Sequence, residues 1–246
     1  MILEIKNKGE FISRFLTRLH KVDNSCMLNL SKDGASSLLS AADNTVILYS
    51  QYAAQLDIEG EMAINIPDLG RLIKILQCID TDEIVLEIAK NQIQYESRDI
   101  RFKYHLLDDG ILASPPVSVN KIKQTVKNCD ISFTLPFSAL ISLIKGSTFS
   151  IDISKVYFFT QSDGVYAEID DKTRHNVDSV CIRLCNEYKG ASITTPLPLS
   201  FETIRILAGS KCININVFVN TKLNVLTFEI NNDNIKNIYI VSGLSK

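Results

Sequence analysis

The sequence predicts an α+β fold in which amphipathic helices lie on one face of antiparallel sheets, in two similar domains. The main observation is a unit of one amphipathic helix flanked by short strands, which occurs four times in 246 residues. This length suits one large domain or two domains of about 120 residues. Because two units fall in each half, we expect two domains. The helices are expected at residues 10–19, 68–78, 137–145 and 201–208.

The composition narrows the class of protein. Apolar residues make up 46% of the chain and charged residues 22%, which provides for real cores and excludes a disordered chain. The net charge of −2 excludes a protein that coats nucleic acid through overall positive charge. The first residues lack the pattern of a signal peptide, and no apolar run approaches the roughly 20 residues of a membrane helix. We expect a soluble, cytoplasmic protein without a membrane partner.

The sequence holds no recognisable catalytic or metal motif. Its six cysteines are scattered, without a C-x-x-C pair and far from the three histidines, which indicates free thiols in a reducing compartment. The acidic run at 80–83 joins an expected helix to an expected strand, and a solvated turn explains it better than a metal site. No Walker, H-E-x-x-H or G-x-S-x-G motif occurs. We expect no catalytic residue, metal or cofactor; an enzyme with a composite site stays an alternative.

In the first half, apolar side chains recur at helical spacing along both helices, and turn residues separate the strands. Pro67 is expected at the first position of the second helix, where its missing N–H costs nothing. The apolar stripes are Phe11, Ile12, Phe15, Leu16 and Leu19, then Leu69, Leu72, Ile73 and Leu76. The strands are expected at 25–30, 35–41, 45–52, 61–65, 83–89, 92–97 and 100–107.

A break follows at 108–128. It contains DDG at 108–110, SPP at 114–116, and then three lysines at 121, 123 and 127. Prolines and turn residues between two periodic regions are typical of an extended connector. We therefore expect an N-terminal domain at 1–109, a connector at 110–128 and a C-terminal domain at 129–246.

The second half repeats the first. Pro136 opens the third helix, and an SDG turn at 162–164 joins two strands. The apolar stripes are expected at Phe137, Leu140, Ile141 and Ile144, then at Phe201, Ile204, Leu207 and Ala208. The strands are expected at 131–135, 155–161, 165–170, 179–185, 191–195, 212–220, 225–230 and 235–241.

Basic residues lie on the polar face of each helix. In the first helix, Arg14, Arg18 and Lys21 are spaced i, i+4 and i+7, which aligns them opposite the apolar stripe. Acids open these helices and bases close them, as the helix macrodipole favours, so a solvated face stays an alternative for any single residue. Since all four helices share this positive charge while the whole chain is acidic, we expect them to face an anionic partner. The other candidates are Arg71, Lys74, Lys145, Arg205 and Lys211.

Several segments together resemble one family. They are the opening amphipathic helix, CMLNLSK at 26–32, SAADNT at 40–45, INIPDLGRLIKIL at 64–76, the proline-containing connector and the repeated second half. In this pattern the whole chain resembles a sliding clamp, the processivity factor of DNA replication. It is most similar to the two-domain clamps of tailed phages, and more distantly to proliferating cell nuclear antigen.

The resemblance implies a non-catalytic ring of six domains, hence a homotrimer, with helices lining a hole that holds double-stranded DNA. Arg14, Arg18, Lys21, Arg71, Lys74, Lys145, Arg205 and Lys211 would then contact phosphates without reading the base sequence. The partners implied are DNA polymerase and a clamp loader, in the cytoplasm of a bacterium or of a phage-infected host. A monomeric DNA-binding processivity module and one subunit of a mixed ring stay alternatives.

The resemblance also implies two protein interfaces. The strand at 101–107 would meet the strand at 179–185 of the next subunit, because open strand edges invite pairing. A peptide of a partner would enter a pocket beneath the connector, unless its residues are ordinary core or connector anchors. The subunit interface is expected at Arg101, Phe102, Tyr104, Val180, Ile182 and Leu184, and the pocket at Val117, Val119, Ile122, Tyr239 and Val241.

Overall fold

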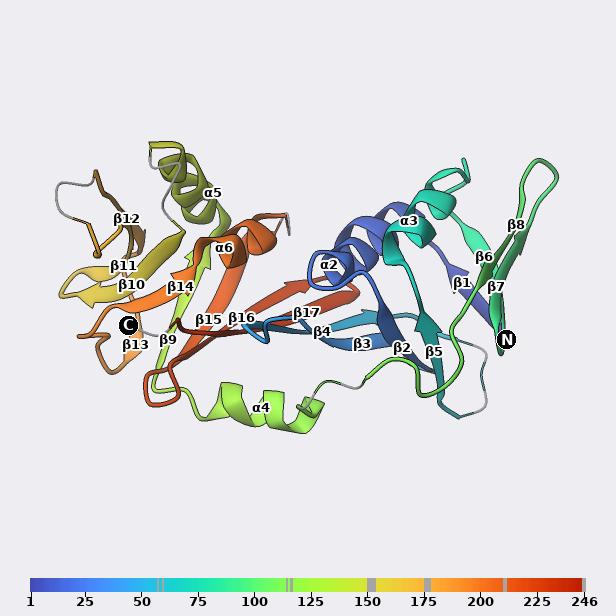
Figure 1. The fold of residues 1–246 in the computed structure, drawn as a ribbon, viewed down its shortest axis with the longest axis horizontal. Coiled ribbons are helices and arrows are strands. Elements are labelled where there is room, and N and C mark those ends of the chain that lie inside the picture. Colours follow the sequence, from blue (N-terminus) through green and yellow to red (C-terminus); the bar gives the residue numbers. More distant parts are fainter. Residues whose placement is uncertain are drawn as a thin grey trace. The chain divides into compact units, whose positions relative to one another are not determined.

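A computed structural model describes residues 1–56, 58, 60–113, 115, 117–149, 154–174, 178–209 and 212–244 (Figure 1). The chain forms two compact units. The first comprises Met1–Ala42, Ile47–Pro116 and Asn232–Asn237, and the second comprises Asp43–Val46, Val117–Asn231 and Ile238–Lys246. No helix among the described residues is long and apolar enough to cross a membrane.

The first unit contains two copies of one arrangement, in which a strand and a helix precede three further strands. The first copy consists of β1 (Ile2–Ile5), a helix of three segments, β2 (Cys26–Ser31), β3 (Gly34–Ser40) and β4 (Val46–Ala53). The second consists of β5 (Met62–Ile66), α3 (Leu69–Gln77), β6 (Ile84–Ala89), β7 (Gln92–Glu96) and β8 (Arg101–His105). The strand orders in this unit are β1-β6-β7-β8 and β4-β3-β2-β5, so each copy lends its first strand to the other.

The second unit repeats this arrangement. Its first copy consists of β9 (Ile131–Pro136), α5 (Phe137–Gly146), a 3₁₀ turn (Ser147–Phe149), β10 (Lys155–Gln161), β11 (Gly164–Ile169) and β12 (Val180–Cys185). Its second consists of β14 (Leu197–Ser200), α6 (Phe201–Ala208), β15 (Asn214–Asn220), β16 (Val225–Asn232) and β17 (Ile235–Ser242). The strand orders are β14-β10-β11-β12 and β9-β15-β16-β17, with a short β13 (Lys189–Gly190) beside β9. The predicted duplication is therefore present, and both halves also share an exchange of first strands that was not predicted.

The first helix is not a regular α-helix. It runs through α1 (Lys8–Glu10), a π-helical segment η1 (Phe11–Leu16) and α2 (Thr17–His20). The N–H of Thr17 donates to the carbonyl of Ile12, five residues back. Its apolar stripe is buried as predicted, and the rings of Phe11 and Tyr52 meet edge to face at 5.0 Å. A π-helical turn is wider than an α-helical one, so the side chains that follow it are rotated.

The buried faces of the other helices follow the sequence, except that Ala208 of α6 and three residues of α5 that were predicted for the core are half-exposed. Leu69, Leu72, Ile73 and Leu76 of α3 are buried, as are Phe201, Ile204 and Leu207 of α6. In α5 the buried leucines are Leu140 and Leu143, whereas Phe137, Ile141 and Ile144, predicted for the core, are half-exposed. Apolar residues cover more than half of the circumference of α5, so the sequence period does not select which of them pack inward.

Three local predictions are corrected, and one strand of the structure was not predicted. The strand expected at 191–195 lies instead at β14, an edge strand, where a proline such as Pro198 is tolerated because its missing N–H faces no partner. Pro67 precedes the second helix, since Asp68 is the N-cap and accepts a hydrogen bond from the N–H of Arg71 at 2.8 Å. Strand β1, which the sequence did not suggest, alternates exposed and buried residues. The connector is not extended throughout, because α4 (Val119–Lys127) forms within it.

Candidate nucleic-acid interface

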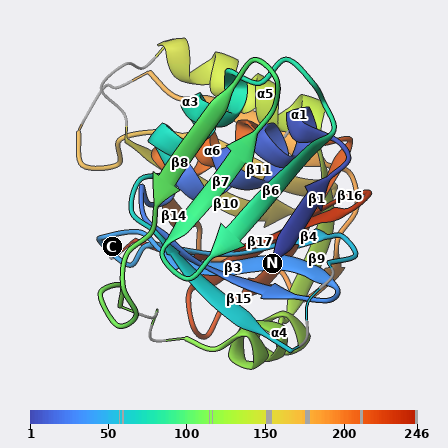
Figure 2. The same cartoon turned by 90° about the vertical axis from the view of Figure 1, so that its right-hand side faces the viewer.

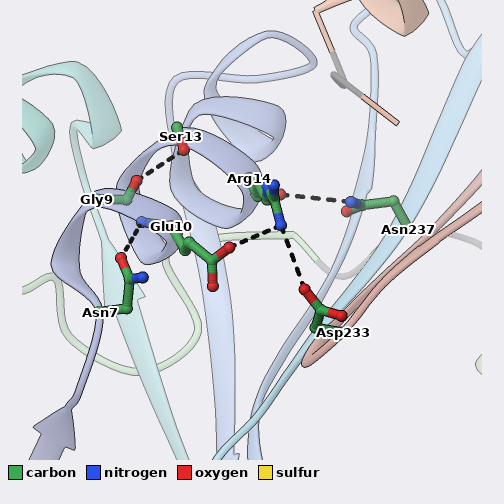
Figure 3. Close-up of polar contacts among 7 residues, drawn as sticks. All are labelled: Asn7, Gly9, Glu10, Ser13, Arg14, Asp233 and Asn237. Atoms are coloured by element: carbon green, nitrogen blue, oxygen red, sulfur yellow. Dashed lines mark hydrogen bonds and ion pairs between the residues drawn. The ribbon is translucent and has the colours of Figure 1, made fainter. Parts of the chain in front are cut away.

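In the first unit, Arg14 is held by carboxylates (Figure 3). Its guanidinium lies 2.7 Å from the carboxylate of Glu10 and 3.8 Å from that of Asp233. Asn237 donates a hydrogen bond to the carbonyl of Arg14 at 3.4 Å and accepts one from Ser50 at 2.6 Å. The positive charge of Arg14 is therefore largely offset before any anion approaches.

The predicted alignment of Arg14, Arg18 and Lys21 on one polar face is not present. Lys21 is exposed just beyond the helix. Arg18 is buried, with 6% of its surface exposed. The π-helical segment contains Arg14 and ends at Leu16, and it rotates the residues after it, Arg18 among them. Of these three cations, Lys21 is the one whose side chain is most open to solvent.

Helix α3 presents Arg71 and Lys74, both exposed. Two side chains satisfy N–H groups at the N-terminus of α3. Asn24 accepts a hydrogen bond from the N–H of Gly70 at 3.2 Å, and Asp68 accepts the one from the N–H of Arg71. The hydrogen bond from the N–H of Arg71 is the main cause that lowers the pKa of Asp68 below its usual value. The α3 cations thus rest on a helix whose first turn is well fixed.

In the second unit, Lys145 is exposed near the end of α5. Arg205 of α6 lies 3.0 Å from the carboxylate of Glu202 and over the ring of Phe201, at 5.2 Å from its centre. Lys211 lies outside the described residues. Helices α5 and α6 pack against each other, as the first helix and α3 do in their own unit. Each unit therefore presents a pair of adjacent helices with exposed basic side chains.

The two strands predicted to meet at a subunit interface both lie at sheet edges. Strand β8 ends the β1-β6-β7-β8 sheet (Figure 2), and β12 ends the sheet of β14, β10 and β11. On β8, Phe102 stacks on Tyr95 at 5.7 Å, and the hydroxyl of Tyr104 donates to the carbonyl of Asp68 at 2.7 Å. Arg101 is exposed and lies 3.7 Å from the carboxylate of Glu96.

On β12, Val180 and Ile182 are half-exposed and Leu184 is buried. The end of α5 lies close to this strand at Gly146, where a Cβ atom would come within 3.1 Å of the side chain of Val180 and 3.2 Å of that of Ile182. The apolar edge of β12 is therefore supported from behind by a helix.

The predicted peptide pocket is largely closed. Ile122, Tyr239 and Val241 are at most 1% exposed, so they belong to the core of the second unit. Val117 and Val119 are half-exposed. Any peptide that docks beside the connector would reach these two valines, and it would have to displace core residues to reach the other three.

Metal-binding chemistry has no visible basis in the described part of the chain, where no group of three potential ligands occurs. In the acidic turn at 80–83, Asp82 accepts a hydrogen bond from the N–H of Gly9 at 3.3 Å. In the described part of the chain, none of the six cysteines forms a disulfide bond. Burial raises the pKa of the Cys26 thiol to about 12, which makes this thiol inert.

No family model and no curated protein matches the sequence. Solved structures of proliferating cell nuclear antigen are similar over its full length. The A. fulgidus protein, bound to the C-terminal region of FEN-1, has a TM-score of 0.78 at 13% identity and covers 100% of this chain and 99% of its own. The Thermococcus kodakaraensis protein has a TM-score of 0.77 at 13% identity, covering 99% of both chains. A PCNA2–PCNA3 complex from Sulfolobus tokodaii has a TM-score of 0.76 at 11% identity, and the match covers 100% of both chains. This chain has the fold of proliferating cell nuclear antigen, the sliding-clamp fold.

Proposed function

We propose that the protein is a DNA sliding clamp, a non-catalytic ring that encircles duplex DNA and tethers a replicative polymerase. The observation that carries the proposal is the helix-and-strand arrangement that occurs four times, twice in each compact unit. Each compact unit therefore has two adjacent helices that present exposed cations. The similarity of the whole chain to proliferating cell nuclear antigen supports it. The phage-type ancestry and the cytoplasmic location are parts of this proposal that rest on sequence resemblance.

The cations would act on DNA through its phosphates. Lys21, Arg71, Lys74 and Lys145 are exposed, so they are the residues best able to release counterions from the duplex. Arg14 and Arg205 already lie beside carboxylates and would contribute less. Such contacts carry no sequence information. The ring would stay on DNA through its closed topology, while weak contacts let it slide.

Ring closure would use the two strand edges. Strand β8 of one copy would pair with β12 of the next, which continues both sheets and covers Phe102, Val180 and Ile182. The ring that the family resemblance implies has six domains. Since each chain supplies two, the ring requires three copies of the chain. Open edges of this kind are normally protected or paired, which favours a homotrimer over an isolated chain.

Partner proteins would dock on the second unit beside the connector. The A. fulgidus neighbour is bound to the C-terminal region of FEN-1, so peptide docking occurs on that fold. In this chain Val117 and Val119 are the accessible apolar residues of the predicted site. DNA polymerase and a clamp loader are the proposed partners.

The test of the clamp function is retention on DNA of different topology. The purified chain, loaded by dilution onto nicked circular duplex, should remain bound through a gel-filtration column, and cutting the circle once should release it. Equal retention on circular and linear duplex at the same salt concentration would contradict the ring and favour a monomeric DNA-binding module.

One observation favours a mixed ring as the second candidate. The Sulfolobus tokodaii neighbour is a complex of two different chains of this fold. In that case this chain alone would form no ring, and retention on circular DNA would require a second clamp subunit from the same source.

A further inference from the structure

We propose that the exposed face of α4 is a docking surface for an acidic segment of a partner protein. The surface consists of Lys121 on one side of the solvent-exposed half of the helix and Lys123 and Lys127 on its other side. It is named here the α4 lysine face. Residues 117–129 contain these three lysines and no acidic residue, although the chain as a whole has a net charge of −2. The inference rests on the proposed function, in which the chain recruits replication proteins.

Helix α4 is firmly attached to the second unit. Its N-cap, Ser118, accepts a hydrogen bond from the N–H of Lys121 at 3.3 Å, and Ile122 on its inner face is completely buried. Beyond its C-terminal end, Asn220 donates to the carbonyl of Asn128 at 3.0 Å. The N–H of Thr221 donates to the carboxylate of Asp130, also at 3.0 Å. The lysines therefore project from a fixed helix.

The three lysines are exposed. Among the residues that the structure describes, none of the three forms an ion pair. Two arginines on other helices differ in this respect, since Arg14 lies beside Glu10 and Arg205 beside Glu202. The α4 lysine face is thus a local excess of positive charge that nothing described in the chain neutralises.

The charges on α4 oppose the stability of the helix that carries them. Lys121 is the third residue after the N-cap, a position where the helix dipole and the capping box favour Glu or Gln. Lys123 and Lys127 are spaced i, i+4, and like charges at that spacing repel each other. Only Lys127, in the last turn, suits the dipole. A helix selected for stability alone would carry acids here, so we infer that the lysines serve binding.

The position of α4 favours a protein partner over DNA. Within the second unit, α4 lies on the opposite face of the β9-β15-β16-β17 sheet from α5 and α6 (Figures 1 and 2). A duplex that contacts α5 and α6 therefore does not reach α4. Lysine ammonium groups are strongly hydrated point charges that attract carboxylates without strict geometry. A flexible acidic segment beside a docking peptide fits this surface, and charge complementarity would speed its association.

The experiment measures binding of a fluorescent oligoglutamate peptide of about twelve residues to the full-length chain by anisotropy, at low and at near-physiological salt. The K121Q/K123Q/K127Q variant removes the α4 lysine face. The matched control, K6Q/K32Q/K90Q, removes three exposed lysines of the first unit and changes the net charge equally. We expect about tenfold weaker binding for the α4 variant, less than about twofold for the control, and weaker wild-type binding as salt increases.

Two further readouts separate this inference from its alternatives. Thermal unfolding of the α4 variant should occur at or above the wild-type temperature, because the lysines oppose the helix; a clear decrease would mean that they are structural and would overturn the proposal. The proposal would also be overturned if the wild type did not bind the peptide, or if both variants lost peptide binding equally. Reduced retention of the α4 variant on circular DNA would overturn it as well. If the wild type fails to be retained on circles but binds the peptide through α4, the clamp function fails and the α4 surface stands.

Discussion

Two arginines on other helices differ from the lysines of α4 in how their charges are balanced. Arg14 and Arg205 each lie beside an acid of the same helix, and Arg18 is buried. The lysines of α4 have no such neighbours among the described residues. The number of basic residues on a helix therefore does not give the charge that the helix offers to a partner. That charge depends on which carboxylates the fold brings close.

The largest expected effect concerns how α4 is held. Ile122 is completely buried, so Ile122→Ala should lower the free energy of unfolding by about 2–5 kcal/mol. Val119→Ala, at a half-exposed position of the same helix, should cost clearly less. Urea unfolding followed by circular dichroism measures both. If the two substitutions lower the free energy of unfolding equally, α4 is not anchored through Ile122. The α4 lysine face would then not project from a fixed helix.

Among the described residues, Arg14 is paired with carboxylates and Lys74 is not, so their substitutions should change DNA binding differently. Lys74→Gln should reduce the salt dependence of binding to circular duplex by about 0.9 in the log–log slope, the value for one lost phosphate contact. Arg14→Gln should change the slope less, because Glu10 and Asp233 already offset its charge. The measurement is binding to nicked circles over a salt series. An equal change for both variants would show that the carboxylates do not compete with DNA.

The smallest effect separates two N-caps. Asp68→Ala in α3 and Ser118→Ala in α4 should each cost about 1 kcal/mol at neutral pH. The pKa of Asp68 is lowered by the hydrogen bond from the N–H of Arg71, so its stabilisation is present above the unfolded pKa of about 3.9. It is lost as the pH falls through the lower folded value.

The cost of Asp68→Ala should therefore shrink below about pH 4, whereas that of Ser118→Ala should stay constant because serine does not titrate. Unfolding at neutral and acidic pH checks this pair of variants. A cost of Asp68→Ala that does not change with pH would mean that its carboxylate does not cap α3.

Helical periodicity predicted where four of the helices lie, and it predicted the buried stripe of α3, where Leu69, Leu72 and Leu76 repeat at the helical spacing. It did not predict which face of α5 packs inward. It missed α4, although Ser118 followed by Val119, Ile122 and Val126 is an N-cap with an apolar stripe. The two prolines just before it dominated the interpretation of that segment.

The basic face of the first helix could not be predicted for a different reason. The π-helical segment that buries Arg18 depends on tertiary packing and leaves no clear pattern in the sequence. The pairing of Arg14 with Asp233 joins positions far apart in the chain. The sequence also could not show whether Tyr239 and Val241 line an open pocket or belong to the core, because this depends on residues far away in the chain.

The proposed ring contains three copies of the chain, and the molar mass in solution tests this most directly. Light scattering over a range of concentrations should give three times 27.5 kDa. Ile182→Pro, which breaks the β12 edge, should give folded monomers. A wild-type chain that remains a monomer at every concentration, or a trimer that persists in Ile182→Pro, would contradict the account.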